Sequence, residues 1–307
     1  MTGIFTYREF SLRDTPPLDG KVALVTGGHG GIGRDRALVL GRISDKFLAA
    51  KEEWQRRHIN LGKDDKRVIF VQCDLGDIFA VKEAADQVRS ITERLDILIC
   101  NGGLGVTTNY ERSPQGVEMV FAANCVGHQE LVTLLLPLLK RTANQHSESR
   151  EARIVVTSSS LHSVCRTLDF NQLTTPARVM PMHPYIDGFW RYCRSKLGNI
   201  LFTRELARRI EQEGPNNIYV NVFFPENIVT EQWKAWDDTQ DGAATAVYLA
   251  TSDRIRVDGI RGQYYIPIAK PDATTDIGND PVLARDLWNW IDTKVTEHLG
   301  LHWQQET

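Results

Sequence analysis

The chain has 307 residues, of which 42% are hydrophobic and 24% charged, a composition typical of a globular protein and not of a disordered or fibrous one. Its net charge of −3 provides no overall positive field, so we expect no nucleic-acid partner and no membrane partner. The five cysteines lack CxxC spacing, which predicts neither a metal site nor a redox pair. No signal-peptide pattern precedes the first apolar run, and we therefore expect a cytoplasmic protein.

Short apolar runs alternate with helical patterns along the chain, and this alternation predicts an α/β fold with a doubly wound parallel sheet. We expect an extension at residues 1–17 and a single domain at residues 18–307. Asp77 and Asp280 are the expected N-caps of two helices. In chain order, strands are predicted at residues 22–26, 68–73, 97–100, 154–158, 219–224 and 263–266, and helices at 43–57, 77–94, 116–140, 189–211 and 281–299.

A glycine-rich turn, T-G-G-H-G-G-I-G at residues 26–33, directly follows the first predicted strand. Only glycine lets the backbone turn so tightly that its N–H groups can approach a pyrophosphate. A flexible loop is the alternative for such a run, but its position after a strand favours phosphate binding.

The next predicted strands also end in polar residues. A carboxylate at Asp74 could accept from an adenine amino group, or it could be a capping or loop residue. Asn101-Gly102 would let the backbone pass close beneath a cofactor or form a plain turn. Ser159 follows the fifth predicted strand, and its hydroxyl is either a ligand of the crevice or a capping group. Asn124 lies in an apolar helix, where an amide must be hydrogen-bonded.

Tyr192 and Lys196 lie four residues apart, which puts the phenol and the ammonium on one face of a predicted helix. A cation beside a phenol stabilises the phenolate and would lower its pKa toward neutral pH. A phenol with a lowered pKa suits general acid/base chemistry on an alcohol or ketone, although such a pair also arises by chance.

Together these motifs resemble those of the short-chain dehydrogenase/reductase family over about residues 18–268. T-G-G-H-G-G-I-G is similar to the family's TGxxxGxG, C-D-L to its adenine-site motif, N-G-G to its NAG and Y-C-R-S-K to its YxxxK. The segment Y-C-R-S-K-L-G-N is similar to the retinol-dehydrogenase-like branch and its fungal relatives. The resemblance implies a Rossmann-type fold and an NAD(P)-dependent oxidoreductase that interconverts a carbonyl and an alcohol.

The resemblance also implies a role for each matched residue. Tyr192 would exchange the proton of the reacting oxygen, Lys196 would hold the nicotinamide ribose, and Ser159 would hold the substrate oxygen. Asn124 would anchor a water that connects Lys196 to solvent. The other implied cofactor-binding residues are Gly27, Gly31, Ile32, Gly33, Asp74, Leu75, Asn101, Gly102, Pro225, Ile228 and Thr230.

The sequence departs from the family pattern most strongly after the glycine turn. Only three residues separate Gly33 from the apolar run at residues 37–40, whereas a parallel crossover needs a dozen or more. Either this run is the second strand and a helix is missing, or it is a helix and the strand is missing. We favour the first interpretation, because Arg42 then resembles the arginine that pairs with the 2′-phosphate of NADP in this branch.

Two further departures lie near residues 225–242. Glu226 stands where the family's PGxVxT segment has glycine, and it would be strained if that position needs a positive φ. The helical lid over the substrate is also shortened, so we expect an open pocket with apolar walls for a lipophilic small molecule.

Two functions follow from these observations. The favoured one is an NADP-dependent dehydrogenase or reductase, which could be a homo-oligomer. The alternative is a truncated, catalytically impaired or non-enzymatic relative that retains the motifs but cannot hold the cofactor.

Overall fold

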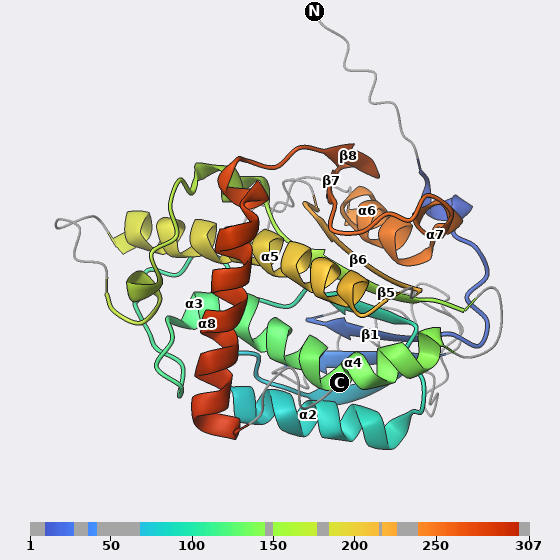
Figure 1. Cartoon of the computed structure of the whole chain (residues 1–307), viewed down its shortest axis with the longest axis horizontal. Helices are drawn as coiled ribbons and strands as arrows, with labels where there is room; N and C mark the ends of the chain where they lie inside the picture. The colour runs from blue at the N-terminus through green and yellow to red at the C-terminus, as the bar shows by residue number, and fades with distance from the viewer. Residues whose placement is uncertain are drawn as a thin grey trace, which may run out of the picture.

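The computed structural model describes residues 10–27, 36–41, 68–144, 150–176, 184–214, 217–225 and 239–300. These residues contain an eight-stranded sheet with the order β3-β2-β1-β4-β5-β6-β7-β8 (Figure 1). All neighbouring strands are parallel except β7 and β8. The strands are β1 (Val22–Thr26), β2 (Arg36–Gly41), β3 (Val68–Gln72), β4 (Ile97–Cys100), β5 (Ala152–Thr157), β6 (Ile218–Phe223), β7 (Tyr264–Ile266) and β8 (Lys270–Asp272). The predicted doubly wound α/β fold is thereby confirmed.

The second strand settles the choice left open by the sequence. β2 pairs in parallel with β1 on one side and with β3 on the other, so residues 37–40 are a strand and not a helix. Nine residues, 27–35, separate Thr26 of β1 from Arg36 of β2. That number is below the dozen residues of an ordinary parallel crossover. The helix predicted at residues 43–57 and the side chain of Arg42 lie outside the described residues.

Helices cover both faces of the sheet. The first face carries α2, α4, α5 and α8, and the second carries α6 and α7. The helices are α2 (Ile78–Ile91), α3 (Met119–Phe121), α4 (Gly127–Ala143), α5 (Pro184–Gln212), α6 (Thr239–Thr251), α7 (Asp253–Val257) and α8 (Pro281–Leu299), with a π-helical segment η2 (Ala122–Val126) between α3 and α4. Short 3-10 helices are η1 (Leu12–Asp14), η3 (Ser160–Val164), η4 (Phe170–Leu173) and η5 (Ile277–Asn279).

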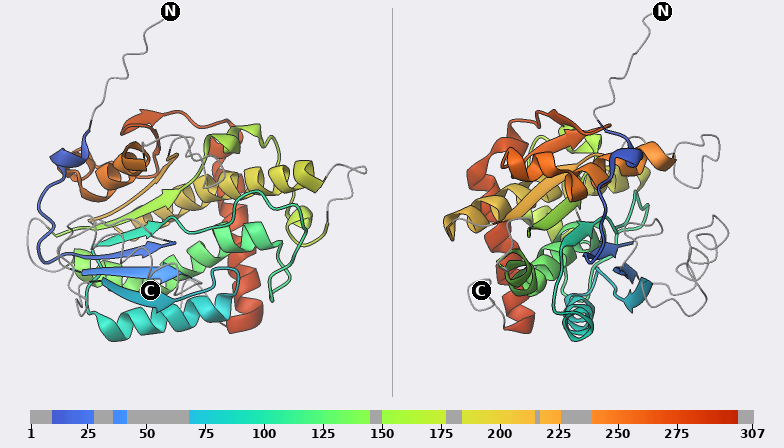
Figure 2. Two further views of the ribbon diagram at one scale, coloured as in Figure 1. Left: turned by 180° about the vertical axis from the view of Figure 1, so that it is seen from behind. Right: turned by 90° about the vertical axis from the view of Figure 1, so that its right-hand side faces the viewer.

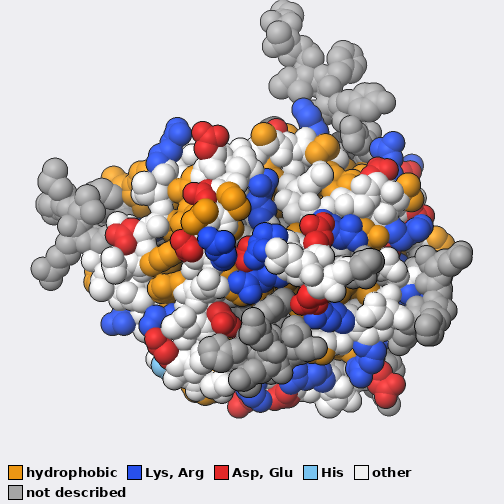
Figure 3. Space-filling model, in the orientation of Figure 1, with side chains coloured by type: hydrophobic (Ala, Val, Ile, Leu, Met, Phe, Trp, Pro, Cys, Tyr) orange, Lys and Arg blue, Asp and Glu red, His pale blue; other side chains and the backbone are white. Residues whose placement is uncertain are grey.

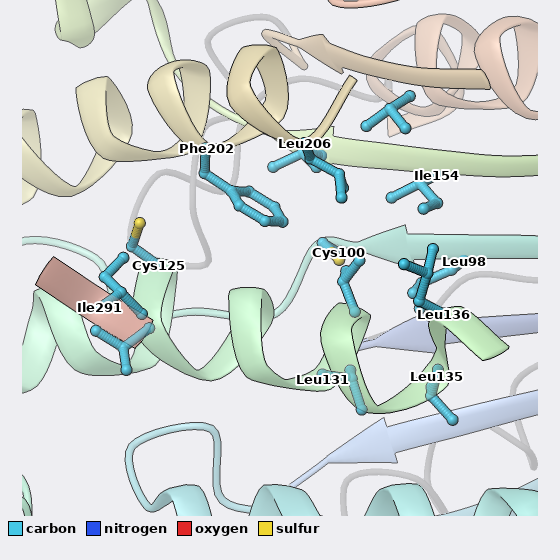
Figure 4. Close-up of a cluster of buried hydrophobic side chains, with 14 of the residues drawn as sticks. Leu98, Cys100, Cys125, Leu131, Leu135, Leu136, Ile154, Phe202, Leu206 and Ile291 are labelled. Carbon is cyan, nitrogen blue, oxygen red and sulfur yellow. The ribbon is translucent and has the colours of Figure 1, made fainter. Parts of the chain in front are cut away.

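The alternation of side chains along each strand explains why two cores form. Val22 and Leu24 of β1 point into the core on the α4 side, whereas Ala23 and Val25 point into the core on the α6 side. Both faces of the central strands are therefore buried, as parallel sheets require. Figure 4 shows the larger core, in which side chains of β4, α4 and α5 interdigitate.

The last helix, α8, crosses the outer side of α5 and runs on toward α2 (Figures 1 and 2). Trp288 of α8 stacks on Phe202 of α5, with 5.8 Å between ring centroids. The side chains of Asp77 and Asp280 accept hydrogen bonds from the first turns of α2 and α8, which confirms both predicted N-caps.

One continuous helix in the described part of the chain, Met119–Ala143, is long and apolar enough to span a membrane. In the structure 94% of its most apolar stretch is buried, which is typical of a core helix.

On the face drawn in Figure 3, basic and acidic side chains lie beside one another.

Residues 10–14 of the predicted N-terminal extension pack on the domain. Phe10 is buried, and its ring meets that of Tyr248 in α6 edge to face, with 5.4 Å between centroids. The boundary between residues 17 and 18 stays a prediction.

Candidate active site

The strand order brings the predicted site residues to one edge of the sheet. β1 lies beside β4, and β4 lies beside β5. Because these strands are parallel, the segments after their carboxyl ends meet. Gly27, Asn101 and Ser159 lie within two residues of those ends.

Gly27 and Gly102 approach each other more closely than residues with side chains could. Gly27 has a φ of +63°, and a Cβ on it would lie 2.6 Å from the Cα of Gly102. A Cβ on Gly102 would in turn lie 3.0 Å from the backbone nitrogen of Gly27. The two turns therefore pack backbone against backbone. Gly31, Ile32 and Gly33 lie outside the described residues.

A buried histidine that sequence reasoning did not single out supports these turns. The Oγ1 of Thr26 accepts hydrogen bonds from the backbone nitrogens of Asn101 (2.9 Å) and Gly102 (2.8 Å). It also lies 2.8 Å from Nε2 of His128, whose Nδ1 lies 2.9 Å from the carbonyl oxygen of Asn124. A carbonyl can only accept, so Nδ1 carries the proton and Nε2 accepts from Thr26. Burial lowers the pKa of His128 to about 4, which keeps the ring neutral.

Asn124 lies in the π-helical segment η2, and its amide is fully buried. Its Oδ1 accepts from the Leu104 nitrogen at 2.7 Å, and its Nδ2 donates to the Leu104 carbonyl at 2.9 Å and to Ser195 Oγ at 3.0 Å. The amide thus holds the segment after β4 against α5, which satisfies the hydrogen-bonding requirement of a buried amide. Its expected role as a water anchor stays a prediction.

Ser159 and Tyr192 meet at the end of β5. The Ser159 hydroxyl lies next to the phenol of Tyr192 in α5 and favours the deprotonated form of that phenol. The Ser159 Oγ also accepts from the Leu161 nitrogen at 3.2 Å, which caps η3. Of the two roles that the sequence left open, the capping role is therefore present, and the role of Ser159 as a ligand of the crevice stays a prediction. Ser159 is buried, whereas Tyr192 is only partly buried.

Lys196 lies one helical turn beyond Tyr192 and is buried. Its Nζ donates to the carbonyl oxygen of Thr157 at 3.2 Å and lies 5.5 Å from the centroid of the Tyr192 ring. Burial lowers the pKa of Lys196 from 10.5 to about 8. Lys196 is therefore protonated at neutral pH, but burying its charge costs the folded state free energy.

The structure corrects one expectation about Tyr192. Its pKa is raised, because burial outweighs the hydrogen bond from Ser159, which lowers it. Lys196 was expected to lower this pKa, but its ammonium lies over the face of the ring. The hydroxyl of Ser159 is the group that favours the phenolate in the described residues.

The lowered pKa of Lys196 makes a test of stability against pH possible. The pKa of Lys196 is 10.5 in the unfolded chain and about 8 in the folded chain. Below pH 8 the lysine is charged in both states, and the folded chain has the full free-energy cost of burying that charge. As the pH rises from about 8 to 10.5 the buried lysine loses its proton, and this cost disappears. Lys196→Met should raise the free energy of unfolding at pH 7 by up to about 3 kcal/mol. Urea unfolding at pH 7 and pH 10.5 measures this, and the gain should shrink at the higher pH.

Thr157 keeps a partner in this variant, because Asn199 Nδ2 also donates to its carbonyl at 2.9 Å. Lys82→Met, on the exposed side of α2, is the matched control and should change the free energy by no more than about 0.5 kcal/mol. A gain that does not depend on pH would contradict the explanation.

Asp74 and Leu75 lie at the end of β3, as predicted. Asp74 Oδ1 accepts from the Gly76 nitrogen at 3.0 Å, so this carboxylate has the loop role that the sequence left open. Leu75 packs under the glycine turns, since a Cβ on Gly102 would lie 3.1 Å from its Cδ1. Pro225 follows β6 and is partly buried, whereas Ile228 and Thr230 lie outside the described residues, as does Glu226.

Arg191, next to Tyr192, is a second important residue that the sequence analysis missed. It is 2% exposed, and its guanidinium forms an ion pair with the buried Glu118 at 3.1 Å and with Asp187 at 2.9 Å. It also donates to Thr107 Oγ1 at 3.1 Å and to the carbonyl oxygens of Thr107 at 2.9 Å and Asn109 at 3.0 Å. An arginine on a helix usually indicates a solvated face, and no local pattern distinguishes this one.

Comparison with known proteins finds relatives over most of the chain. Residues 21–166 match the family model of the short chain dehydrogenases. The chain is 33% identical to the short chain dehydrogenase/reductase dpchH of Colletotrichum higginsianum over 306 positions, which cover 89% of this chain and 74% of that protein. It is 30% identical to retinol dehydrogenase 14 of Mus musculus over 305 positions, which cover 89% of this chain and 85% of that protein.

Among solved structures, an uncharacterized protein from Mycobacterium paratuberculosis has the same fold, with a TM-score of 0.72 and 23% identity. The similarity covers 94% of this chain and 97% of that one. The resemblance inferred from the motifs is confirmed by the relatives, which include both a retinol dehydrogenase and a fungal enzyme. The chain belongs to the short-chain dehydrogenase/reductase family of oxidoreductases.

Proposed function

We propose that the protein is an NAD(P)-dependent oxidoreductase that interconverts a carbonyl and an alcohol, with Tyr192 as the general acid/base. The observation that carries this proposal is the meeting of Ser159, Tyr192 and Lys196 at the carboxyl end of β5. Ligands of open α/β sheets bind at this end. The family uses NAD(P), and a bound nicotinamide would supply or accept the hydride.

The buried lysine fits a nicotinamide ribose. An ammonium has three N–H donors, and in the described residues Lys196 Nζ donates to one acceptor, the carbonyl of Thr157. The remaining donors suit ribose hydroxyls. Asn101 and Gly102 suit the path of a dinucleotide because Gly102 lets their turn pack backbone against backbone on Gly27 at the carboxyl ends of β1 and β4.

Each residue then has one task. Tyr192 gives its proton to the carbonyl oxygen during reduction and takes it back during oxidation. Ser159, whose hydroxyl favours the phenolate of Tyr192 in the free chain, donates its single proton to the substrate oxygen when a substrate is bound. Lys196 would hold the nicotinamide ribose beside the Tyr192 ring through the N–H donors that it does not use on Thr157. Asn124 holds the backbone after β4 in place by its two hydrogen bonds to Leu104.

We further propose a lipophilic small-molecule substrate. Half-buried apolar side chains of Leu161, Phe189 and Phe224 lie in the segments around Ser159, Tyr192 and the end of β6. Retinol dehydrogenase 14, one of the relatives, is named for a lipophilic alcohol. A cytoplasmic location and a homo-oligomeric state also remain proposals.

The cofactor preference is tested by fluorescence titration of the purified chain with NADPH and NADH. If Arg42 faces the adenosine ribose, its charge-assisted contact with a 2′-phosphate favours NADPH about ten- to a hundredfold. Arg42→Ala should remove this preference, whereas Arg13→Ala, near the N-terminus, should leave it unchanged. Equal affinities of the unmodified chain for the two cofactors would refute the role of Arg42.

The short connection between β1 and β2 supports the second candidate function, a relative that binds cofactor poorly. A phosphate site at a glycine turn depends on the free N–H groups and the positive end of the helix that follows. Residues 27–35 must contain both the turn and the return to β2, which leaves too few residues for an ordinary crossover helix.

For this candidate we expect a Kd for NADPH well above micromolar, and insertion of about 12 to 15 helix-forming residues after Gly33 should tighten binding. Isothermal titration calorimetry of both chains measures the change. An insertion of equal length made of glycine and serine is the control, since it adds chain but no helix dipole. Micromolar or tighter binding by the unmodified chain would exclude this candidate.

A further inference from the structure

A second buried histidine, His162, lies three residues after Ser159 and contacts its backbone. It belongs to η3, and its side chain is 3% exposed. Its Nδ1 lies 2.7 Å from the carbonyl oxygen of Ser159, and its backbone nitrogen donates to the same oxygen at 3.2 Å. The Ser159 carbonyl therefore receives two hydrogen bonds from one residue.

The other ring nitrogen of His162 reaches the C-terminal part of the chain. Nε2 lies 3.0 Å from the Oγ1 of Thr274, which follows β8. Because the Ser159 carbonyl can only accept, Nδ1 carries the ring proton and Nε2 accepts from the Thr274 hydroxyl. Burial lowers the pKa of His162 and keeps this neutral form at pH 7, although the hydrogen bond with the Ser159 carbonyl and the charge of Asp272 oppose the shift.

Contacts from the C-terminal segment fix the ring in place. Tyr264 of β7 meets it edge to face, with 5.0 Å between ring centroids. A Cβ on Gly278 of η5 would lie 2.3 Å from the Thr274 Oγ1, so the glycine leaves the space that this hydroxyl occupies. The position of the His162 ring is thus set by residues about a hundred positions further along the chain.

We propose that His162 is a positioning residue for Ser159. The ring joins the Ser159 peptide to the segment 264–279 and thereby sets the direction in which the Ser159 hydroxyl points toward Tyr192. The inference rests on the proposed function, in which Ser159 and Tyr192 act as a pair. It extends the site to the segment 264–279, which contains none of the site residues predicted from the sequence.

The test uses the hydroxyl environment of Tyr192 in the full-length chain, which needs neither cofactor nor substrate. The protein is labelled with tyrosine carrying ¹³C at Cζ, and the resonance that disappears in Tyr192→Phe is followed by NMR at pH 7. Ser159→Ala removes the hydroxyl next to the Tyr192 phenol and calibrates the displacement of that resonance. Thermal unfolding of each variant shows that it is folded.

Three substitutions separate the two bonds of the ring. His162→Asn keeps a donor at the position of Nδ1, His162→Gln keeps a polar group on the side of Thr274, and His162→Leu keeps neither. His162→Leu and His162→Gln should move the Tyr192 resonance by at least half of the Ser159→Ala displacement. His162→Asn keeps the bond to Ser159 but loses the link to Thr274, so it should move the resonance by less than His162→Leu does. Ser163→Ala, at an exposed residue of the same short helix, should leave the resonance at the wild-type position.

Combining His162→Leu with Ser159→Ala should give no displacement beyond that of Ser159→Ala alone, because both act through one hydroxyl. A resonance that moves in Ser159→Ala but not in His162→Leu would overturn the positioning role and leave the proposed function intact. A resonance that does not move in Ser159→Ala would overturn both, because the Ser159–Tyr192 pair would then be absent. If His162→Leu does not fold, the difference between His162→Asn and His162→Gln decides in the same way.

Discussion

Replacement of Tyr192 by phenylalanine should lower turnover by at least about 10²-fold, because it removes the only oxygen that can exchange a proton with the substrate in the proposed reaction. The ring and its contacts with Lys196 remain, so the affinity for the cofactor should change little. Initial rates with NADPH and a set of aromatic and long-chain aldehydes measure the first effect. A fluorescence titration measures the second.

Tyr185→Phe is the matched control for this prediction. Tyr185 lies on the same helix, α5, and its side chain is 56% exposed. Loss of its hydroxyl should leave turnover within twofold of the unmodified chain. Retained turnover in Tyr192→Phe would remove Tyr192 from the role of acid/base, whereas equal losses in both variants would point to a defect of α5 as a whole.

Arg191→Ala should have the largest effect on stability and lower the free energy of unfolding by about 3 to 5 kcal/mol. The substitution leaves Glu118, which is 2% exposed, buried without its cation. It also removes the hydrogen bonds that join α5 to Thr107 and Asn109. Urea unfolding followed by circular dichroism measures the difference.

Two variants separate the buried ion pair from the other contacts of Arg191. Asp187→Asn removes the more exposed carboxylate, whose side chain is 30% exposed, and should lower stability by no more than about 1 kcal/mol. Arg191→Met combined with Glu118→Gln should be more stable than Arg191→Ala, because no uncompensated charge remains. A double variant as unstable as Arg191→Ala would show that the lost hydrogen bonds, and not the buried charge, dominate.

The central strands could be predicted because both of their faces are buried. Runs such as residues 97–100 are continuously apolar, and the prediction matches β4 to the residue. β8 was missed, since its three residues, Lys270–Asp272, are all exposed and include a proline and two charges. An edge strand of this kind carries no hydrophobic signal.

The start of α5 and the π-helical segment show a second limit. The sequence predicted a helix from residue 189, but α5 begins at Pro184, where a proline suits the first turn. The apolar residues of its first turn are exposed, so the amphipathic pattern begins later than the helix. The segment Ala122–Val126 reads as ordinary helix in the sequence, but the structure has a π-helical segment there, in which Asn124 bonds to Leu104 and Ser195.

Part of the candidate site could be predicted from residue types and their positions: a serine after a strand end, and a tyrosine and a lysine four residues apart on a helix. Ser159, Tyr192 and Lys196 lie together as expected. His162 and Arg191 could not be found in this way, because each also has a partner that is distant in sequence, Thr274 for His162 and Glu118 for Arg191, and neither partner was conspicuous. The direction of the Tyr192 pKa shift also depends on how deeply the phenol is buried. The four-residue spacing of Tyr192 and Lys196 in the sequence gives no information on burial.

The contact between Gly27 and Gly102 constrains how this sequence can vary. An added Cβ on Gly27 would collide with the Gly102 backbone at 2.6 Å, and one on Gly102 would crowd the Gly27 nitrogen at 3.0 Å; in both cases the neighbouring atom is backbone, which is present whatever amino acid is there. A change at one glycine therefore cannot be compensated by a change at the other. In a library that randomises both positions, each should select glycine independently, without the paired exchange that large and small side chains in contact show.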